Sequence, residues 1–452
     1  MRMIPAERRA AGALACIYGL RMLGLFLVLP VLALAARDLS GATPLLIGVA
    51  VGIYGLTQAA LQIPFGLVSD RLGRKRVIAV GLLLFAAGSA IAALADSMAL
   101  LILGRALQGA GAIAAALMAL AADLTREGVR TRVMAVIGIS IGASFSAALV
   151  LGPVFHAWFD LAGLFWFATA LAVVALVLLF VIVPTPRVQR VHRDARPVWS
   201  QVRQVLAQRE LLRLDGGIFI LHLIMTGTFV AVPLALADAG LAGRDHWEVY
   251  LPVFGASLAL MGPLVMLAER HDRTRPVFIA ALALVAVSQA GLAVYGDSVI
   301  GIGLALLLFF AGFNVLEASL PALISRVAPV AHKGTAMGIY STSQFLGAFA
   351  GGVGGGLLHG LGGPSAVFAT LGLAAGGWLL LAYGMRVPPP VSSFVVPLDY
   401  APDRDMEQVA QQLSGLPGVE EAVVVAEERV AYLKVNRQTF DREALQRAGF
   451  EA

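Results

Sequence analysis

Long apolar runs constrain this chain more than any other feature of its sequence. Runs of about 20 residues recur from residue 10 to residue 385, and each can cross a hydrocarbon core about 30 Å thick as a helix. Helices are needed there because backbone amides in lipid have no water to bond. Hydrophobic residues make up 59% of the chain and charged residues 13%, against about half and a quarter in soluble proteins. The sequence therefore predicts an all-α integral membrane protein.

Twelve membrane-spanning helices are predicted, at residues 10–36, 43–68, 77–95, 98–124, 132–155, 160–183, 214–237, 247–268, 276–295, 299–325, 333–358 and 364–385. An even number of spans puts both chain ends on one side of the membrane. The loops on that side carry most of the lysines and arginines between spans, whereas the opposite loops hold only Arg37 and Arg244. Because Lys and Arg are enriched in cytoplasmic loops, we expect both termini in the cytoplasm.

A basic segment at residues 184–213 interrupts the pattern between the sixth and seventh spans. It predicts an N-terminal six-helix bundle over 1–183, a cytoplasmic linker over 184–213 and a C-terminal six-helix bundle over 214–386. Within the linker, residues 198–211 have the pattern of a helix. A basic segment of this kind either lies on anionic lipid headgroups or forms a solvated tether, and both readings stay open.

Residues 391–452 form a separate soluble domain that follows a spacer of three prolines. They include 6 Lys or Arg and 11 Asp or Glu, and this acidic balance opposes binding to nucleic acid. The pattern predicts, in order, a strand at 394–398, a helix at 405–413, strands at 419–426 and 430–435, and a helix at 442–447. This order favours a small α+β ferredoxin-like sandwich whose last strand is short or missing. We expect it to act in regulation or partner docking.

Neither a metal site nor an organic cofactor is expected. Cys16 is the only cysteine, so the chain can form no internal disulfide and no cysteine-based metal site. The glycine run at 351–356 lacks the Lys-Ser/Thr that follows in a phosphate-binding loop. It is read instead either as a place where two membrane helices pack closely or as a hinge.

The turn between the second and third spans is a dense group of charges, reading Gly-Leu-Val-Ser-Asp-Arg-Leu-Gly-Arg-Lys-Arg from Gly66 onward. Gly66 permits close helix contact, and Gly73 permits a tight turn. Asp70 can bind a helix amino terminus, and Arg74 can bind an acid at another helix end, for which Asp123 is available. A loop that only fixes topology is the simpler reading. The glycine spacing and the embedded acid favour a conformational latch.

The same turn recurs in the second half of the chain, where residues 263–275 align without gaps with residues 64–76. The matched pairs are Pro64 and Pro263, Asp70 and Glu269, Arg71 and Arg270, Arg74 and Arg273, and Arg76 and Arg275. Such internal repeats are typical of transporters. The second copy lacks both glycines of the first, so we expect it to keep the turn without the close packing.

Charged side chains inside the predicted spans are the main candidates for function. Arg21, Arg105 and Glu317 lie well inside spans, at a cost of about 2.5–3.5 kcal/mol each on insertion scales. Such residues usually face a water-filled cavity, the alternative being a structural pair or a side chain that reaches the interface. Glu317 is the candidate proton site. His222 also titrates near neutral pH, although a lone histidine on an apolar face is more often a core residue.

Uncharged polar and aromatic side chains complete the candidate cavity. They are Tyr54, Gln58, Gln108, Phe313, Asn314 and Gln344. Some of the amides are expected to join helices, at about 0.6 kcal/mol each, and packing is the simpler explanation for any one aromatic.

Three motifs resemble those of the major facilitator superfamily. The segment from Gly66 to Arg76, which includes Arg71, is similar to motif A at every defining position. Residues 101–109 resemble motif B with its intramembrane arginine. Residues 138–153 resemble the motif C of drug/proton antiporters, but the glycine run expected after Pro153 is missing. The resemblance implies the twelve-helix fold of that family over residues 10–385.

A closer resemblance is to the YajR-type branch of the family. It rests on residues 20–30, 53–58, 313–318 and 338–344 and on the carboxy-terminal domain. The branch implies proton-driven efflux across the inner membrane of a bacterium. In the family, the motif A acid meets the start of helix 11, here near Lys333, and the motif A arginine meets the helix 4 acid. These contacts hold the outward-open state.

Two functions from different classes remain after this reading. The first is a transporter that exports a small amphipathic solute in exchange for protons, which act as the coupling ion. The second is a receptor without transport that signals through residues 391–452, and an uncoupled facilitator is a third option. We expect a monomer in the lipid bilayer that is neither an enzyme nor a nucleic-acid-binding protein.

Overall fold

The computed structural model describes residues 3–185, 199–270, 273–329, 332–384, 391–398, 406–425, 430–436, 439–448 and 450. Its elements are α1 (Pro5–Phe26), α2 (Leu32–Ala35), η1 (Ala36–Asp38), α3 (Pro44–Leu72), α4 (Arg74–Ala93), α5 (Met98–Ala110), α6 (Ala114–Asp123), α7 (Glu127–Val181), α8 (Trp199–Leu206), α9 (Arg209–Asp238), η3 (Gly243–Asp245), α10 (Trp247–Arg270), α11 (Thr274–Tyr295), α12 (Val299–Val327), α13 (Lys333–Tyr383), β1 (Val391–Pro397), α14 (Met406–Ser414), β2 (Val419–Val425), β3 (Val430–Asn436) and α15 (Arg442–Arg447).

Ten helices in the described part of the chain are long and apolar enough to cross a membrane. Two of them, α7 and α13, have 55 and 51 residues, which at 1.5 Å per residue exceeds twice the thickness of a hydrocarbon core. Helical geometry is lost at Asp160 in α7 and at Gly362 and Gly363 in α13. Gly362 and Gly363 lie in a predicted loop between spans, and Asp160 is the first residue of the predicted span 160–183. The bundle therefore has ten membrane helices if α7 and α13 are each counted once, and twelve if each is counted as two helices that meet at the interruption.

Two predicted spans are less regular than expected. The first span, predicted as continuous over 10–36, loses its helix after Phe26 and resumes it at Leu32. Pro30 lies in this gap and has no N–H to donate. The predicted span 98–124 is divided into α5 and α6 by three non-helical residues that begin at Gly111. These breaks matter below because they leave backbone carbonyls inside the bundle that other groups must satisfy.

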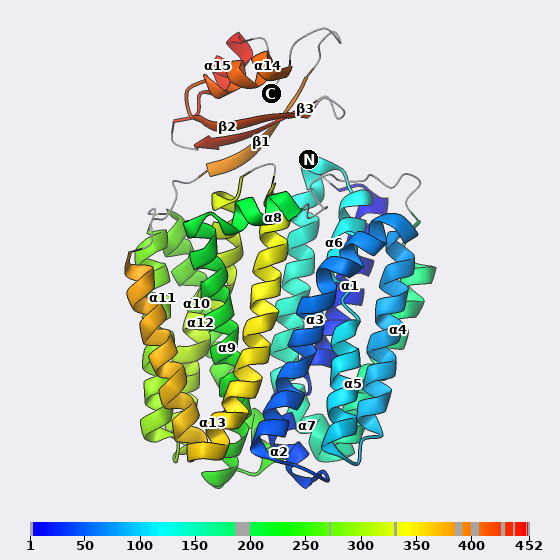
Figure 1. Ribbon diagram of the computed structural model, residues 1–452, viewed down its shortest axis with the longest axis vertical. Helices are drawn as coiled ribbons and strands as arrows, with labels where there is room; N and C mark the ends of the chain where they lie inside the picture. Colours follow the sequence, from blue (N-terminus) through cyan, green and yellow to red (C-terminus); the bar gives the residue numbers. More distant parts are fainter. Residues whose placement is uncertain are drawn as a thin grey trace.

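The linker helix was predicted too long. Instead of one helix over 198–211, α8 ends at Leu206 and α9 begins at Arg209. Val205 is 1% exposed and packs into the apolar core of α9 to α13, because α8 lies across the end of the bundle (Figure 1). This part of the linker is therefore bound to protein. The remaining linker residues, 186–198, lie outside the described residues.

Buried apolar side chains form separate clusters before and after the linker. One draws its members from residues 11–183. Another draws most of its members from residues 205–382, with Phe145 and Leu149 of α7 added. Each set of helices thus packs mainly within itself.

The two sets meet closely where α3 passes α13. A Cβ on Gly52 would lie 2.7 Å from the carbonyl oxygen of Phe349, and one on Gly352 would lie 2.7 Å from the Cα of Gly52. Only glycine permits this approach of two backbones. The contact lies toward the start of α3, at the end of the bundle remote from the N-terminus (Figure 1). The glycine run at residues 351–356 therefore marks a place of close helix packing.

The C-terminal residues form a small sheet with two helices, at the same end of the bundle as the N-terminus (Figure 1). The strand order is β1-β3-β2, and both neighbouring pairs are antiparallel. Burial alternates along β3, with Leu433 buried beside Val396 of β1 and Leu413 of α14. The predicted order of strands and helices is confirmed, with shifts of one to three residues at the ends of elements.

Candidate functional site

Arg21 of α1 is fully buried in the first half of the bundle. Its Nη2 donates to the carbonyl oxygen of Gly111 at 2.8 Å and to Oε1 of Gln58 at 2.9 Å. Gly111 is the first residue of the break between α5 and α6, and its carbonyl oxygen accepts from both the guanidinium and the backbone N–H of Ile113, at 2.9 Å from the latter. The predicted candidates Arg21 and Gln58 are therefore in direct contact.

Arg105 of α5 forms a second buried network next to the first. Its Nε donates to the carbonyl oxygen of Ala50 at 3.2 Å, and its Nη1 donates to Oε1 of Gln108 at 2.7 Å. Gln108 in turn donates to the hydroxyl of Ser89 at 2.7 Å. Sequence reasoning missed Ser89 because a lone serine in a span gives no pattern to detect.

The ring of Tyr54 lies between the two guanidinium groups. Its centroid is 5.9 Å from Cζ of Arg21 and 5.4 Å from Cζ of Arg105, within the range of a cation–π interaction. Its hydroxyl donates to Gln58 at 3.2 Å. Among the described residues neither arginine has a carboxylate within ion-pair distance. This half of the bundle therefore holds two buried positive charges that only neutral groups stabilise.

Glu317 of α12 forms the corresponding group in the second half. Its Oε1 accepts a hydrogen bond from Nε2 of Gln344 at 3.2 Å, and its Oε2 lies 3.9 Å from Nε2 of His222. The same Gln344 amide lies 2.8 Å from Nε2 of His222. The Glu317 side chain is 37% exposed. A carboxylate and an imidazole thus share one amide partner, and the Oε2 atom of Glu317 is buried although the side chain as a whole is partly exposed.

The tautomer of His222 follows from its neighbours. The Gln344 amide can only donate, so Nε2 of His222 accepts. Nδ1 lies 3.3 Å from the carbonyl oxygen of Ile218 and donates to it. This arrangement describes a neutral imidazole, which can take up a proton only if the Gln344 amide turns away.

The two remaining cavity candidates lie on the same helix, and the ring centroid of Phe313 lies 5.9 Å from that of His222. Asn314 donates to the hydroxyl of Ser257 on α10 at 3.2 Å. Phe313 is 5% exposed and stacks on Phe309 and Phe145, with centroids 5.6 and 6.4 Å apart. The structure places Phe313 in an aromatic cluster that joins α12 to α7, which agrees with the packing interpretation.

The turn between α3 and α4 brings its charges together as the sequence predicts. Arg74 forms an ion pair with Asp70, and its Nε lies 3.5 Å from Oδ2 of Asp123. All three side chains are at most 4% exposed. Arg74 also donates to the hydroxyl of Ser69 at 2.7 Å, a partner that sequence reasoning missed.

The other members of this turn have simpler positions. Gly73 has φ +98°, a conformation that glycine adopts without strain. A Cβ on Gly66 would be 3.4 Å from Cβ of Ala115, and the side chain of Arg71 is exposed. Within the described residues, no ion pair joins Asp70 to Lys333 at the start of α13.

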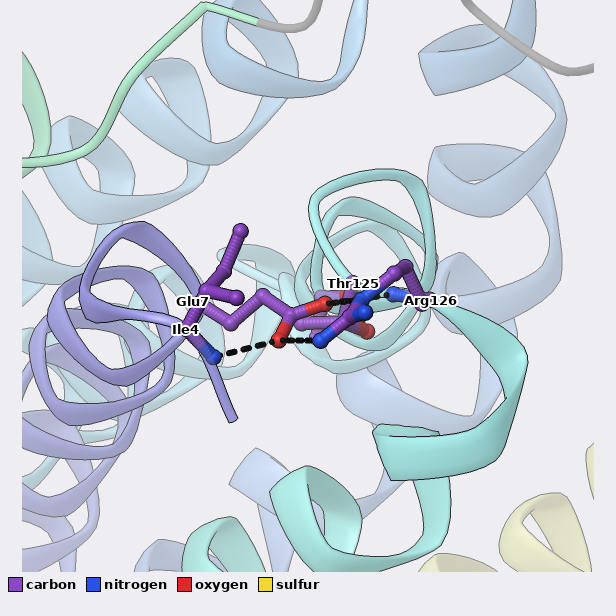
Figure 2. Close-up of polar contacts among 5 residues, drawn as sticks. Ile4, Glu7, Thr125 and Arg126 are labelled. Atoms are coloured by element: carbon purple, nitrogen blue, oxygen red, sulfur yellow. Dashed lines mark hydrogen bonds and ion pairs between the residues drawn. The ribbon is translucent and has the colours of Figure 1, made fainter. Parts of the chain in front are cut away.

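A second charge cluster nearby was missed altogether (Figure 2). Glu7, 3% exposed, accepts hydrogen bonds from Nε and Nη2 of Arg126 at 2.8 and 3.0 Å and from the backbone N–H of Arg126 at 3.1 Å. Its Oε2 also accepts from the N–H of Ile4 at 2.9 Å. The carboxylate raises the pKa of Arg126. Glu7 precedes the first predicted span, so it reads as an ordinary loop charge in the sequence.

Together these ion pairs join the ends of five helices. Glu7 belongs to α1, Asp70 to α3, Arg74 to α4 and Asp123 to α6, and Arg126 immediately precedes α7. Asp123 and Arg126 are only three residues apart, so the two clusters adjoin. Charge-assisted bonds of this kind are short and directional. They fix the helices of the first half to one another at the end that carries the termini.

Comparison with known proteins identifies the family. The model of the Major Facilitator Superfamily matches residues 14–266 and 217–403. The chain is 44% identical over 453 residues to the inner membrane transport protein YajR of Escherichia coli K12, covering 99% of this chain and 98% of the relative. It is 28% identical over 344 residues to the multidrug resistance protein MdtH of Aeromonas hydrophila, covering 75% of this chain and 84% of the relative.

Solved structures agree on the fold. A bacterial homologue of the human lysosomal transporter Spinster, in an inward-facing and occupied conformation, aligns with a TM-score of 0.70 at 12% identity, over 85% of this chain and 98% of that one. The human organic anion transporter MFSD10 aligns with a TM-score of 0.62 at 21% identity, over 84% of this chain and 100% of that one. The resemblance found in the sequence motifs is confirmed, and the chain belongs to the major facilitator superfamily.

Proposed function

We propose that this protein is a secondary active transporter of a bacterial inner membrane that exports a small amphipathic solute in exchange for protons. The relatives support the direction and the location, since their names describe an inner membrane transport protein and a multidrug resistance protein. The fold proposed is twelve membrane helices in two six-helix halves, with a ferredoxin-like domain that lacks its last strand.

The Glu317 group is the observation that carries proton coupling. A carboxylate inside a membrane helix is costly unless it faces water or a partner, and this one has a partner. Its Gln344 and His222 neighbours provide a donor and a second titratable group. Proton binding at Glu317 removes the charge there, and we propose that this change alters the balance between the two conformations. We propose that Arg21 and Arg105, held by Tyr54, Gln58 and Gln108, provide fixed positive charge in the other half.

Alternating access is proposed from the contact between the halves. The glycine contact of α3 with α13 holds the halves together at the end remote from the termini. We propose that it closes the periplasmic end and leaves the cytoplasmic end open. In the opposite state the cytoplasmic ends approach, and Asp70 then reaches the start of α13. The Asp70–Arg74–Asp123 cluster is already assembled for that contact.

Transport by reconstituted protein tests the coupling assignment. In proteoliposomes loaded with a fluorescent amphipathic dye, an imposed proton gradient is expected to drive dye transport by the unmodified protein. Glu317→Gln keeps the size and hydrogen bonding of the side chain but cannot titrate, so gradient-driven transport should fall by about tenfold or more. Exchange of dye for dye without a gradient should persist. Equal gradient-driven transport by both proteins would remove Glu317 as the proton site, and transport that needs no gradient would indicate a facilitator.

A further inference from the structure

A crevice opens between α9, α11, α12 and α13, away from the candidate site. It has a volume of about 240 Å³, and its walls are almost entirely apolar. The lining residues used below are Gly216 and Gly217 of α9, Phe278 of α11, Leu320 of α12, and Trp378 of α13, with Arg213 at the rim. Trp378 and Phe278 meet edge to face at 6.2 Å and form a rigid aromatic wall.

Two glycines keep the crevice open. A Cβ on Gly217 would lie 2.9 Å from the Trp378 ring, so a side chain there would push the ring aside. A Cβ on Gly216, by contrast, would meet nothing within 4 Å. The space beside Gly216 is therefore unfilled by protein. A well-packed interior does not leave such a space without an occupant or a cost.

The crevice faces the bilayer. Leu381 and Leu212, which line it, are 68% and 44% exposed. Leu373 and Leu380 on the same stretch of α13 are 78% and 79% exposed. Apolar side chains this exposed, on helices that cross a membrane, mark a surface in contact with lipid chains. The natural occupant of a crevice in that surface is an acyl chain.

Two arginines converge at the mouth of the crevice. Arg213 of α9 donates to the carbonyl oxygen of Gly384 at 3.4 Å, and Arg275 of α11 donates to that of Tyr383. These carbonyls belong to consecutive residues, so the two guanidinium groups from separate helices lie close together. Both side chains are exposed. Glu210 pairs with Arg213 at 2.9 Å, which leaves the mouth with a net positive charge.

We propose that this crevice binds one acyl chain of an anionic glycerophospholipid from the cytoplasmic leaflet, with its phosphate at Arg213 and Arg275. The apolar walls match the chain, and the paired arginines match the headgroup charge. The mouth lies at the end of α13 near the termini, the end assigned to the cytoplasm by the basic loops. The site does not depend on proton coupling or on the transported solute.

Fluorescence of Trp378 tests the proposal directly. The other tryptophans, Trp158, Trp166, Trp199 and Trp247, are replaced by Phe, and the protein is reconstituted in phosphatidylcholine vesicles. Phosphatidylglycerol or phosphatidylcholine with brominated acyl chains is then added in small mole fractions, because bromine quenches tryptophan only at short range. We expect half-maximal quenching by the anionic lipid at about a fivefold lower mole fraction.

Variants separate the site from general contact with lipid. Gly216→Leu fills the crevice and should abolish the preference for the anionic lipid. Gly377→Leu is the matched control, since Gly377 is exposed on α13, has free space around its Cβ and lies outside the crevice. Arg213→Gln with Arg275→Gln should equalise the two lipids while quenching persists.

Three results would overturn the proposal. One is equal quenching by both lipids in the protein with unmodified crevice residues. Another is the same quenching in Gly216→Leu and Gly377→Leu. The third is protection of Trp378 from both lipids together with dimerisation, which would assign the crevice to a second copy of the chain. Lipid adducts counted by native mass spectrometry, on the chain with all its tryptophans, should show the same order of affinities.

Discussion

The interiors of the two halves carry opposite kinds of charge. In the first half, Arg21 and Arg105 are at most 4% exposed, and neutral acceptors and an aromatic ring surround them. In the second half, Glu317 is 37% exposed, beside His222. A buried arginine keeps its proton at any physiological pH, whereas a carboxylate and an imidazole can exchange theirs. Halves with the same helical plan therefore provide fixed charge on one side and titratable charge on the other.

The two halves also differ at their turns near the termini. The first half joins its helix ends through two adjoining ion-pair clusters around Arg74 and Arg126. The corresponding turn of the second half keeps the acid and the arginines in sequence but has no glycine at either matched position. We infer that the first half behaves as the more rigid body, and that the second half holds the group whose protonation changes.

The largest effect is expected where the two halves meet. The halves must move relative to each other at this contact before the difference in their charges or in their turns can affect transport. Gly352→Leu places a side chain against the backbone of α3, since even its Cβ would lie 2.7 Å from Gly52. Efflux should fall by about tenfold or more, because the periplasmic end can no longer close. Gly354→Leu is the matched control, with nothing within 4 Å of the added Cβ. Equal efflux rates in the two variants, assayed in proteoliposomes, would show that this contact does not close the transporter.

A smaller effect is expected on stability. Removing an amide should lower the unfolding free energy more at the Arg105 group than at the Glu317 group. Gln108→Leu removes the acceptor of the buried Arg105 guanidinium and the donor to Ser89, and should cost about 2 kcal/mol of unfolding free energy. Gln344→Leu removes the one amide donor that Glu317 and His222 share, but the Glu317 side chain is partly exposed and can regain a bond to water, so the cost should be smaller, about 1 kcal/mol. Denaturant unfolding in detergent measures both. Equal losses of unfolding free energy would mean that the two polar groups are equally buried, and would contradict the difference between the halves.

The smallest effect concerns the conformational balance. Asp70→Asn removes the charge that we propose reaches the start of α13 in the outward-open state, and should shift the ratio of the two conformations away from outward-open by about fivefold, the equivalent of about 1 kcal/mol. Glu269→Gln changes the matched acid of the second half and should shift it less. Labelling of cysteines introduced at the cytoplasmic and periplasmic ends reports the ratio. A shift of the same size in both variants would indicate that the two turns are equivalent latches.

Many residues of the candidate site could be predicted from the sequence, because a charged residue is easy to recognise within an apolar run. Arg21, Arg105 and Glu317 could be singled out from insertion cost alone, and Asp123 followed as a partner for Arg74 from its position at a neighbouring helix end. Glu7 was not found, although it is 3% exposed. It lies outside the apolar runs, where an acid is expected in water. Burial at a helix end depends on which loop folds over it, and local sequence does not encode that.

The sequence by itself determined the membrane class, the positions of the helices, the side of the termini and the family, because each depends on composition or on short local patterns. Only the tertiary structure decided which charges meet. It joined Arg21 to the carbonyl at the break before α6, brought Gln344 between Glu317 and His222, and placed the contact of the halves at glycines of α3 and α13. These pairs are far apart along the chain and depend on helix rotation and depth, which packing sets and hydropathy does not report.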